Sequence, residues 1–321
     1  MEQYSIFDLY PHESKVYKIE KPIRLIELFA GIGAQAKALK NIDADFEYYK
    51  TSEWDIQAVR SYRAIHKGYE EVEPFGNLQE NAERLYKMGI STDGKTPMSL
   101  EQILKKGNKW VCQALDDYKS INNLGSITNI HGKDLEIVDT EKYDYLLTYS
   151  FPCQDLSICG LHKGMSKGDS TRSGLLWEVE RILRELAVEY SEMPQILVME
   201  NVDQVIGSSN IEDFKEWLEF LNGIGYTNTY KVLNAKDFGI PQSRARCFMV
   251  SIYGDYNIKM PDGTNITATM KEFLEDDVQQ KYYVLTEKAH KLIDKLIKEH
   301  KILTNERTNE RTNERTNKRT D

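Results

Sequence analysis

The chain has 321 residues, of which 40% are hydrophobic and 29% charged, as in ordinary globular domains. Its net charge of −9 argues against an extended nucleic-acid-binding surface, so any nucleic acid is expected to contact local basic patches. No run of eighteen apolar residues suggests a membrane helix, and the first residues lack a signal-peptide pattern. The four cysteines form no CxxC pair, which predicts reduced thiols in a cytoplasmic protein and no metal site.

The first regular elements are a strand, a glycine turn and a helix. Residues 1–22 look like an irregular lead, and Ile23–Phe29 is an apolar run of strand length. Gly31 and Gly33 follow, and then a helical pattern begins. This order is typical of nucleotide-binding α/β folds, in which glycines let the backbone approach a ligand at a helix N-terminus. The third glycine of the dinucleotide fingerprint is missing, which argues against NAD.

The second predicted strand, Phe46–Ser52, ends in Glu53 and Trp54. An acid at the end of the second strand typically binds ribose hydroxyls. A tryptophan beside it can pack against an adenine ring. The alternative is an exposed acid next to a core tryptophan.

Residues 68–125 are expected to be a helical insertion without chemistry of its own, in which Ser99 and Gln102 form a capping box. Ser126–Ile130 is expected to be a short third strand, followed by Asp134. This acid could accept a hydrogen bond from an adenine amino group, although a lone aspartate is more often a turn residue.

A cysteine follows the next predicted strand, Tyr143–Tyr149. Cys153 comes directly after Pro152, which places a thiol at the rim of the sheet. A lone cysteine is ordinarily a buried structural residue. The loop that follows, up to Arg172, is rich in glycine and basic residues. It is either a solvated loop or a flap that closes over an anionic substrate.

The last predicted strands bring further polar groups. Gln195–Val202 contains Glu200, which would lie beside Cys153 if their strands are neighbours. Tyr230–Ala235 and Cys247–Ile252 are two more strands. Just before the second, Arg244 and Arg246 would point the same way from an extended chain and could converge with Gln242, unless this is a solvated edge strand. The whole pattern predicts an α/β fold: a mixed, mostly parallel sheet with helices on both faces.

Several of these segments together, over residues 23 to 252, resemble the bacterial DNA cytosine-5 methyltransferases. Each alone is a weak signal, but their joint order and spacing are specific. Ala34 differs from many members, which carry another glycine there. The matching segments are Phe29-Ala30-Gly31-Ile32-Gly33, Glu53-Trp54, Asp134-Leu135, Ser150-Phe151-Pro152-Cys153-Gln154, Glu200-Asn201-Val202 and Gln242-Ser243-Arg244-Ala245-Arg246.

The resemblance implies a catalytic role for Cys153, which would add to C6 of a cytosine flipped out of double-stranded DNA. Glu200 would bind N3 and the exocyclic amine, which needs a proton on Glu200 or on N3. Arg246 would hold the O2 carbonyl and Arg244 would support the site. Gln154 and Gln242 would contact the substrate.

The resemblance also implies a Rossmann-like fold that binds S-adenosylmethionine as methyl donor. The residues of the glycine turn, Phe29, Ala30, Gly31, Ile32 and Gly33, would flank its methionine part. Glu53 would bind the ribose, and Pro152 would lie near the sulfonium. The adenine would be contacted by Trp54, Asp134 and Leu135.

The resemblance further implies a variable target-recognition region after Ile252, and none is recognisable. We expect a catalytic domain over residues 23–256 and a helical extension over residues 257–303, with a helical pattern from Thr286 to Leu303. The chain is then a truncated and impaired enzyme of a restriction-modification system, with a cognate restriction endonuclease as a further partner. Alternatives are the catalytic half of a split enzyme completed by a second chain, a tRNA cytosine-5 methyltransferase, and a non-catalytic S-adenosylmethionine-binding module.

Residues 304–321 repeat Thr-Asn-Glu-Arg and contain no apolar side chain, which predicts a disordered tail. The repeat can be encoded by the tetranucleotide ACGA read through all its frames. Because four is not a multiple of three, gain or loss of one such unit shifts the reading frame. We hypothesise that this chain is the short-frame product of a gene that is switched in this way.

Overall fold

The structure is a computed structural model that describes residues 15–152, 173–190, 192–264, 269–275, 278–279 and 286–299. Cys153, Gln154, the loop up to Arg172 and the repeat tail lie outside the described residues. The chain divides into two units, Met1–Thr267 and Ala268–Asp321.

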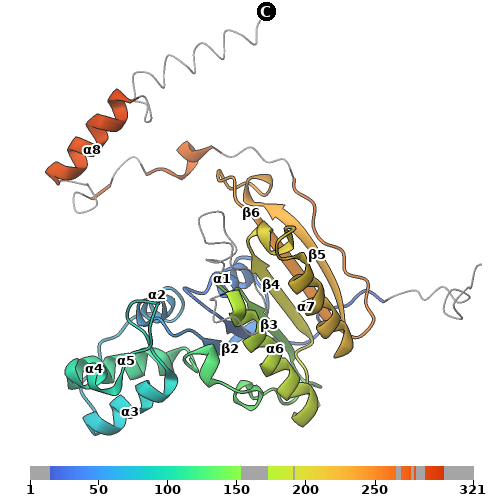
Figure 1. Cartoon of the computed structure of the whole chain (residues 1–321), viewed down its shortest axis with the longest axis horizontal. Helices are drawn as coiled ribbons and strands as arrows, with labels where there is room; N and C mark the ends of the chain where they lie inside the picture. The colour runs from blue at the N-terminus through green and yellow to red at the C-terminus, as the bar shows by residue number, and fades with distance from the viewer. Residues whose placement is uncertain are drawn as a thin grey trace, which may run out of the picture. The chain divides into compact units, whose positions relative to one another are not determined.

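The first unit contains a six-stranded sheet with the order β2-β1-β3-β4-β6-β5 (Figure 1). Strands β2, β1, β3 and β4 run parallel, whereas β6 is antiparallel to both β4 and β5. This confirms the predicted mixed, mostly parallel sheet. The strands are β1 Ile23–Leu28, β2 Phe46–Ser52, β3 Asp144–Tyr149, β4 Ile196–Asn201, β5 Tyr226–Asn234 and β6 Ala245–Tyr253.

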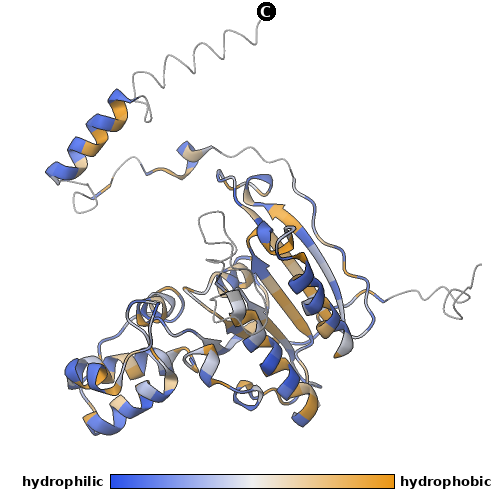
Figure 2. Ribbon diagram, viewed as in Figure 1, coloured by the Kyte–Doolittle hydropathy of each residue, from blue (hydrophilic) through white to orange (hydrophobic). Residues whose placement is uncertain are grey.

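Helices cover both faces of this sheet, as predicted. Side chains alternate along β3, so Tyr145 and Leu147 belong to one core and Leu146 to the other. The first core includes α6 (Leu176–Glu185) and α7 (Ile211–Gly223), and the second includes α1 (Ala34–Asn41) and α2 (Ile56–His66). Figure 2 shows apolar strands in the middle of the sheet and polar outer surfaces on α6 and α7.

The helical insertion contains α3 (Leu78–Met88), α4 (Leu100–Lys105) and α5 (Asn108–Ser120), which lie together beside the sheet in Figure 1. The capping box of Ser99 and Gln102 is present. The buried Asp117 of α5 pairs with Arg60 and Arg63 of α2, which joins the insertion to the α/β core. The short helical turns are η2 Ile127–Asn129, η3 Gly132–Leu135, η4 Ser173–Leu175, the π turn η5 Leu186–Tyr190, η6 Asp203–Ile206 and η7 Ala235–Asp237.

The prediction of a strand at Ser126–Ile130 is wrong, because this segment contains the 3₁₀ turn η2. The Ser126 N–H donates to the Met88 carbonyl at the end of α3, 2.8 Å away, and not to a strand. Pairing with β2 is limited to an isolated bridge between Thr51 and Asn123. Gly125 then turns the chain away at φ +90°.

The second unit contains a 3₁₀ turn, η8 (Met270–Phe273), and the helix α8 (Glu287–Lys298). The Thr286 hydroxyl caps α8 by accepting from the Ala289 N–H. This helix lies within the helical pattern predicted from Thr286 to Leu303. None of the helices in the described part of the chain is long and apolar enough to cross a membrane.

The glycine turn between β1 and α1 is present as predicted. Gly31 and Gly33 both have left-handed backbones, with φ +53° and +80°. A Cβ atom on Gly33 would lie 2.4 Å from the His66 ring and 2.6 Å from the Tyr62 ring, whereas one on Gly31 would meet nothing within 4 Å. Of these two positions, both need glycine for the left-handed backbone, but only Gly33 also lacks room for a side chain.

The buried carboxylate of Glu27, in β1, stabilises the helices that follow this turn. The Glu27 carboxylate accepts hydrogen bonds from the Ala36 N–H of α1, at 3.2 Å, and from the Tyr62 hydroxyl of α2, at 2.5 Å. Burial raises the pKa of Glu27 to about 7, although both hydrogen bonds favour the ionised form. Glu27 thus joins β1 to both helices behind the turn.

We predict that Glu27→Gln removes a pH dependence of stability. The unfolded chain loses the Glu27 proton near pH 4.3, whereas the folded protein keeps it up to about pH 7. The free energy of unfolding of the wild type should therefore fall, relative to the variant, by about 3–4 kcal/mol as pH rises through this window. Urea denaturation at several pH values measures this, and a pH-independent difference between the two proteins would contradict it.

We also predict unequal costs for alanine at the two glycines. Gly31→Ala should lower the free energy of unfolding by roughly 1–2 kcal/mol, because only the left-handed backbone is strained. Gly33→Ala should lose about 1–3 kcal/mol more, because its methyl group overlaps His66 and Tyr62. Denaturation of both variants without ligand is the measurement, and equal losses would show that the overlap relaxes freely.

Candidate active site

A cavity of about 910 Å³ opens where the parallel strands β2, β1 and β3 end. The residues that follow these strands line it: Phe29 after β1, Glu53 and Trp54 after β2, and Ser150 and Pro152 after β3. Ligands of open α/β sheets bind at this edge. Four of these residues, Phe29, Glu53, Trp54 and Pro152, are ones that the sequence analysis assigned to one cofactor site.

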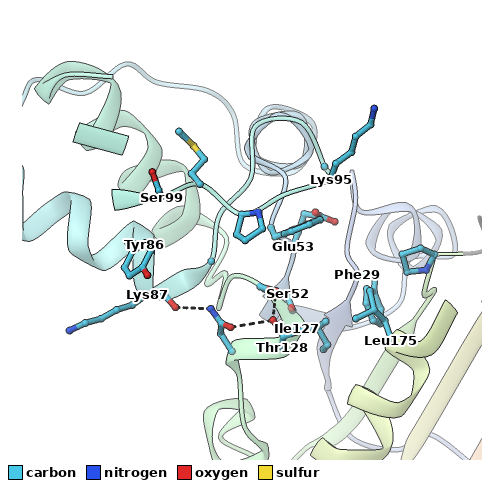
Figure 3. A pocket seen from close by; sticks show the side chains of 18 of the residues that line it. Phe29, Ser52, Glu53, Tyr86, Lys87, Lys95, Ser99, Ile127, Thr128 and Leu175 are labelled. Atoms are coloured by element: carbon cyan, nitrogen blue, oxygen red, sulfur yellow. Dashed lines mark hydrogen bonds between the residues drawn. The ribbon is translucent and has the colours of Figure 1, made fainter. Parts of the chain in front are cut away.

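Residues from the insertion complete the cavity (Figure 3). Phe29 and Leu175 lie toward one end, Tyr86, Lys87 and Ser99 toward the other, and Glu53 between them. The cavity therefore continues from the sheet edge into the region between residues 68 and 125. The insertion was expected to carry no chemistry, and its composition gives no signal of this role.

Glu53 connects the glycine turn to the end of β2. One carboxylate oxygen accepts from the Gly31 N–H at 3.0 Å, and the other accepts from the Asp55 N–H at 2.8 Å. Burial raises the pKa of Glu53, and these backbone hydrogen bonds oppose that rise. Ala30 is buried, Ile32 is exposed, and the Ala30 N–H bonds to the Ser52 carbonyl, so the turn is fixed against β2.

The backbone of Trp54 is held by the insertion. Its carbonyl accepts from the Tyr118 hydroxyl of α5 and from the Ser91 N–H, each at 2.7 Å. Trp54 is also one of the residues that line the cavity. A fixed aromatic residue here offers a flat surface to a planar ring.

Asp134 and Leu135 are placed elsewhere by the structure. The Asp134 carboxylate accepts from the His131 N–H at 2.8 Å, and Leu135 is fully buried in the core under the sheet. The segment from Ser126 to Asn129 lines the cavity instead. Gly125, whose left-handed backbone turns the chain just before this segment, is the residue in the sequence that could have indicated this turn.

A second group of polar residues lies at the end of β4. The Glu200 carboxylate is 3.0 Å from the Arg246 Nε, and both side chains are about three-quarters buried, being 26% and 21% exposed. Antiparallel pairing of β4 with β6 brings them together, because Glu200 lies opposite Phe248, two residues beyond Arg246. The two residues meet as expected.

Arg244 and Gln242 are exposed and precede β6. The Arg244 N–H donates to the Asn234 side chain at 2.9 Å. In the described part of the chain, Glu200 pairs with Arg246, which lies within β6, and Arg244 lies one residue before this strand.

Asn201 connects β4 to the segment that contains Cys153. Its buried side-chain amide donates to the Phe151 carbonyl at 3.1 Å, two residues before the cysteine. Strands β3 and β4 are parallel neighbours, which is the condition stated above for Glu200 to lie beside Cys153. The sequence predicts no role for Asn201, although it directly follows Glu200.

Comparisons with known proteins agree with this arrangement. A family model described as C-5 cytosine-specific DNA methylase matches residues 23–93 and 102–321. The chain is 37% identical over 275 residues to the orphan methyltransferase M.SssI of Spiroplasma monobiae, which covers 84% of this chain and 69% of that protein. It is 34% identical over 267 residues to the type II methyltransferase M2.ScrFI of Lactococcus lactis subsp. cremoris, covering 82% and 70%.

A solved structure, the Dnmt2 methyltransferase of S. pombe, shares the fold with a TM-score of 0.50 and 16% sequence identity. The match covers 84% of this chain and 64% of that chain, so this chain spans less than two thirds of that protein. Because the family model matches well over half of the residues, the chain belongs to the C-5 cytosine-specific DNA methylase family.

Proposed function

We propose that this protein transfers a methyl group from S-adenosylmethionine to C5 of a cytosine flipped out of double-stranded DNA. The observation that carries the proposal is the arrangement at one edge of the sheet. A cavity with Phe29, Glu53 and Trp54 lies at the ends of β1 and β2, and the Glu200–Arg246 pair lies at the end of β4. Family membership supports the same chemistry.

The residues of the cavity fit the cofactor. A carboxylate suits a ribose diol, and the Trp54 ring suits adenine. Ser126 and Ile127 take the place at the adenine end that sequence assigned to Asp134 and Leu135. The turn from Phe29 to Gly33 and Pro152 would flank the methionine part. S-adenosylmethionine supplies an activated methyl group there.

Cys153 is the proposed nucleophile. C5 of cytosine is a poor nucleophile, and addition of the Cys153 thiolate to C6 makes it reactive. After C5 has gained the methyl group, it loses its proton and the C6–sulfur bond breaks, which restores both the base and the thiol. The Asn201 hydrogen bond to Phe151 supports this role, because it fixes the backbone just before the cysteine.

Glu200 and Arg246 are proposed to hold the base. Glu200 would bind N3 and the amine, and Arg246 would bind O2, with Arg244, Gln154 and Gln242 as further substrate contacts. The ion pair supports this assignment, because two opposite charges 3.0 Å apart present a donor and an acceptor to one polar ring edge. The pair would loosen as the base takes over its hydrogen bonds.

We further propose that these 321 residues methylate slowly by themselves and that a second chain supplies target recognition. The alignments cover 69% and 70% of the two methyltransferases. A restriction endonuclease with the same target is a proposed partner, by analogy with the relative named as a type II methyltransferase. Lysate from the same organism should raise the rate, and an unchanged rate would argue against a missing chain.

Methyl transfer to duplex DNA and to tRNA tests the activity itself. Cys153→Ala should abolish transfer to DNA, and Glu200→Gln should lower kcat by about 10²–10³. Cys112→Ala is the matched control, because it removes a buried thiol from α5 in the insertion, and it should retain activity. Transfer that persists in Cys153→Ala, or that occurs on tRNA and not on DNA, would refute the proposal.

Calorimetry tests the cofactor site. Trp54→Ala should weaken S-adenosylmethionine binding about tenfold, the usual cost of losing one base–aromatic stack. Trp110→Ala serves as control, because Trp110 lies on α5 against the cations Arg60 and Lys106. Equal dissociation constants for the two variants would place the adenine elsewhere.

A further inference from the structure

The segment from Ser126 to Ile130, here called the cavity wall, is held from the insertion side by two hydrogen bonds. The Ser126 N–H donates to the Met88 carbonyl at 2.8 Å, and the Asn129 side-chain amide donates to the Lys87 carbonyl at 3.0 Å. Both acceptors belong to the last turn of α3, where helix carbonyls lack intrahelical partners. These bonds fix one side of the wall.

Arg181 of α6 holds the wall from the opposite side. Its Nη2 donates to the Ile130 carbonyl at 2.8 Å and to the Ile127 carbonyl at 3.3 Å. These two carbonyls belong to the wall itself, and Ile127 is one of the residues that line the cavity. One guanidinium thus fixes the path of the backbone across the 3₁₀ turn.

Two acids on the same helix hold the guanidinium in place. Its Nε donates to Glu178 at 2.8 Å and its Nη1 donates to Glu185 at 2.7 Å. These partners lie three and four residues away, the spacing at which side chains meet on a helix. Because the guanidinium is planar, fixing Nε and Nη1 also fixes the direction of Nη2.

The same helix holds the chain just beyond the wall. Glu185 accepts from the Gly132 N–H at 2.7 Å. Gly132 lies so close to α6 that a Cβ atom on it would be 3.0 Å from the Ile182 carbonyl. Leu175, which directly precedes α6, lines the cavity. The helix therefore carries both a cavity residue and the support of the wall.

We propose that Arg181 is a positioning residue for the cofactor, because it fixes the cavity wall against which the adenosine part binds. The inference rests on the proposed function of this cavity. Loss of Arg181 removes no direct contact to the cofactor, but it lets the wall move away from it. It therefore weakens cofactor binding while the remainder of the fold persists.

Calorimetric titration of the full chain with S-adenosylmethionine tests this. Arg181→Met should raise the dissociation constant about tenfold, because charge-assisted hydrogen bonds to two carbonyls are lost. Arg184→Met is the matched control: it removes another arginine of α6, which pairs with Glu180 and lies over the Phe220 ring. It should change the constant by less than about twofold, because the contacts of Arg184 are to Glu180 and Phe220 and not to the carbonyls of the cavity wall.

Arg181→Lys and hydrogen exchange separate positioning from a general loss of stability. Lysine keeps the charge beside Glu178 and Glu185, but it lacks the fork that reaches both carbonyls. We expect intermediate affinity, with faster amide exchange confined to residues 126–132. If the methionine variant does not fold, the lysine variant carries the test.

The outcomes separate the inference from the proposed function. A wild-type chain that does not bind S-adenosylmethionine would refute the proposed function. A wild-type chain that binds it, together with an Arg181→Met or Arg181→Lys variant that binds equally well, would overturn only the role of Arg181. Faster exchange throughout the sheet would overturn it as well, because the effect would then be global.

Discussion

The site depends on the parallel pairing of β3 with β4. This pairing brings the ends of both strands to one edge of the sheet, so that the Ser150–Pro152 segment and Glu200 emerge side by side. The buried Asn201 amide then bonds to the Phe151 carbonyl, which fixes the chain directly before Cys153. An unpaired amide at this depth would cost about 1–3 kcal/mol, so the hydrogen bond is strongly favoured. The catalytic proposal follows from this constraint, since it sets the direction in which the thiol-bearing segment leaves the sheet.

The cofactor cavity depends on a second set of connections, which runs across the sheet edge. Glu53 bonds to the Gly31 N–H, Trp54 is held by Tyr118 and Ser91, and the wall is held between α3 and Arg181. These contacts join residues from distant parts of the sequence. The insertion therefore acts as one side of the cavity and is more than a connection between strands. In physical terms, the cavity is stabilised because backbone groups at the strand ends find hydrogen-bond partners elsewhere in the protein.

Sequence predicted those parts of the fold in which local pattern and tertiary environment agree. The strands β1 and β3 are short runs whose side chains are almost all buried on both faces, and the glycine turn has the backbone that its residues favour. The family resemblance assigned Glu200 and Arg246 to one base, and the antiparallel pairing of β4 with β6 accounts for their contact. The fold class and the family were predictable for the same reason: they depend on the order of such units.

The remaining residues were set by tertiary contacts that no local pattern shows. Ser126–Ile130 is rich in β-branched residues, which favour strands, but the carbonyls of α3 and the guanidinium of Arg181 hold it in a turn. Asp134 was assigned to adenine because it follows this segment, yet its carboxylate serves the backbone of His131. Arg244 is exposed just before β6, whereas Arg246 lies within β6 and pairs with Glu200. In each case a hydrogen bond or a strand boundary decided the outcome.

The central claim is that Cys153, Glu200 and Arg246 act on one flipped cytosine. Incubation with S-adenosylmethionine and duplex DNA that contains 5-fluorocytosine tests it most directly, because fluorine cannot leave C5 as a proton does and the adduct should persist. The account predicts a covalent protein–DNA complex that survives denaturation, maps to Cys153 by mass spectrometry and disappears in Cys153→Ala. An adduct at another cysteine, or its undiminished formation in the Cys153→Ala variant, would contradict it.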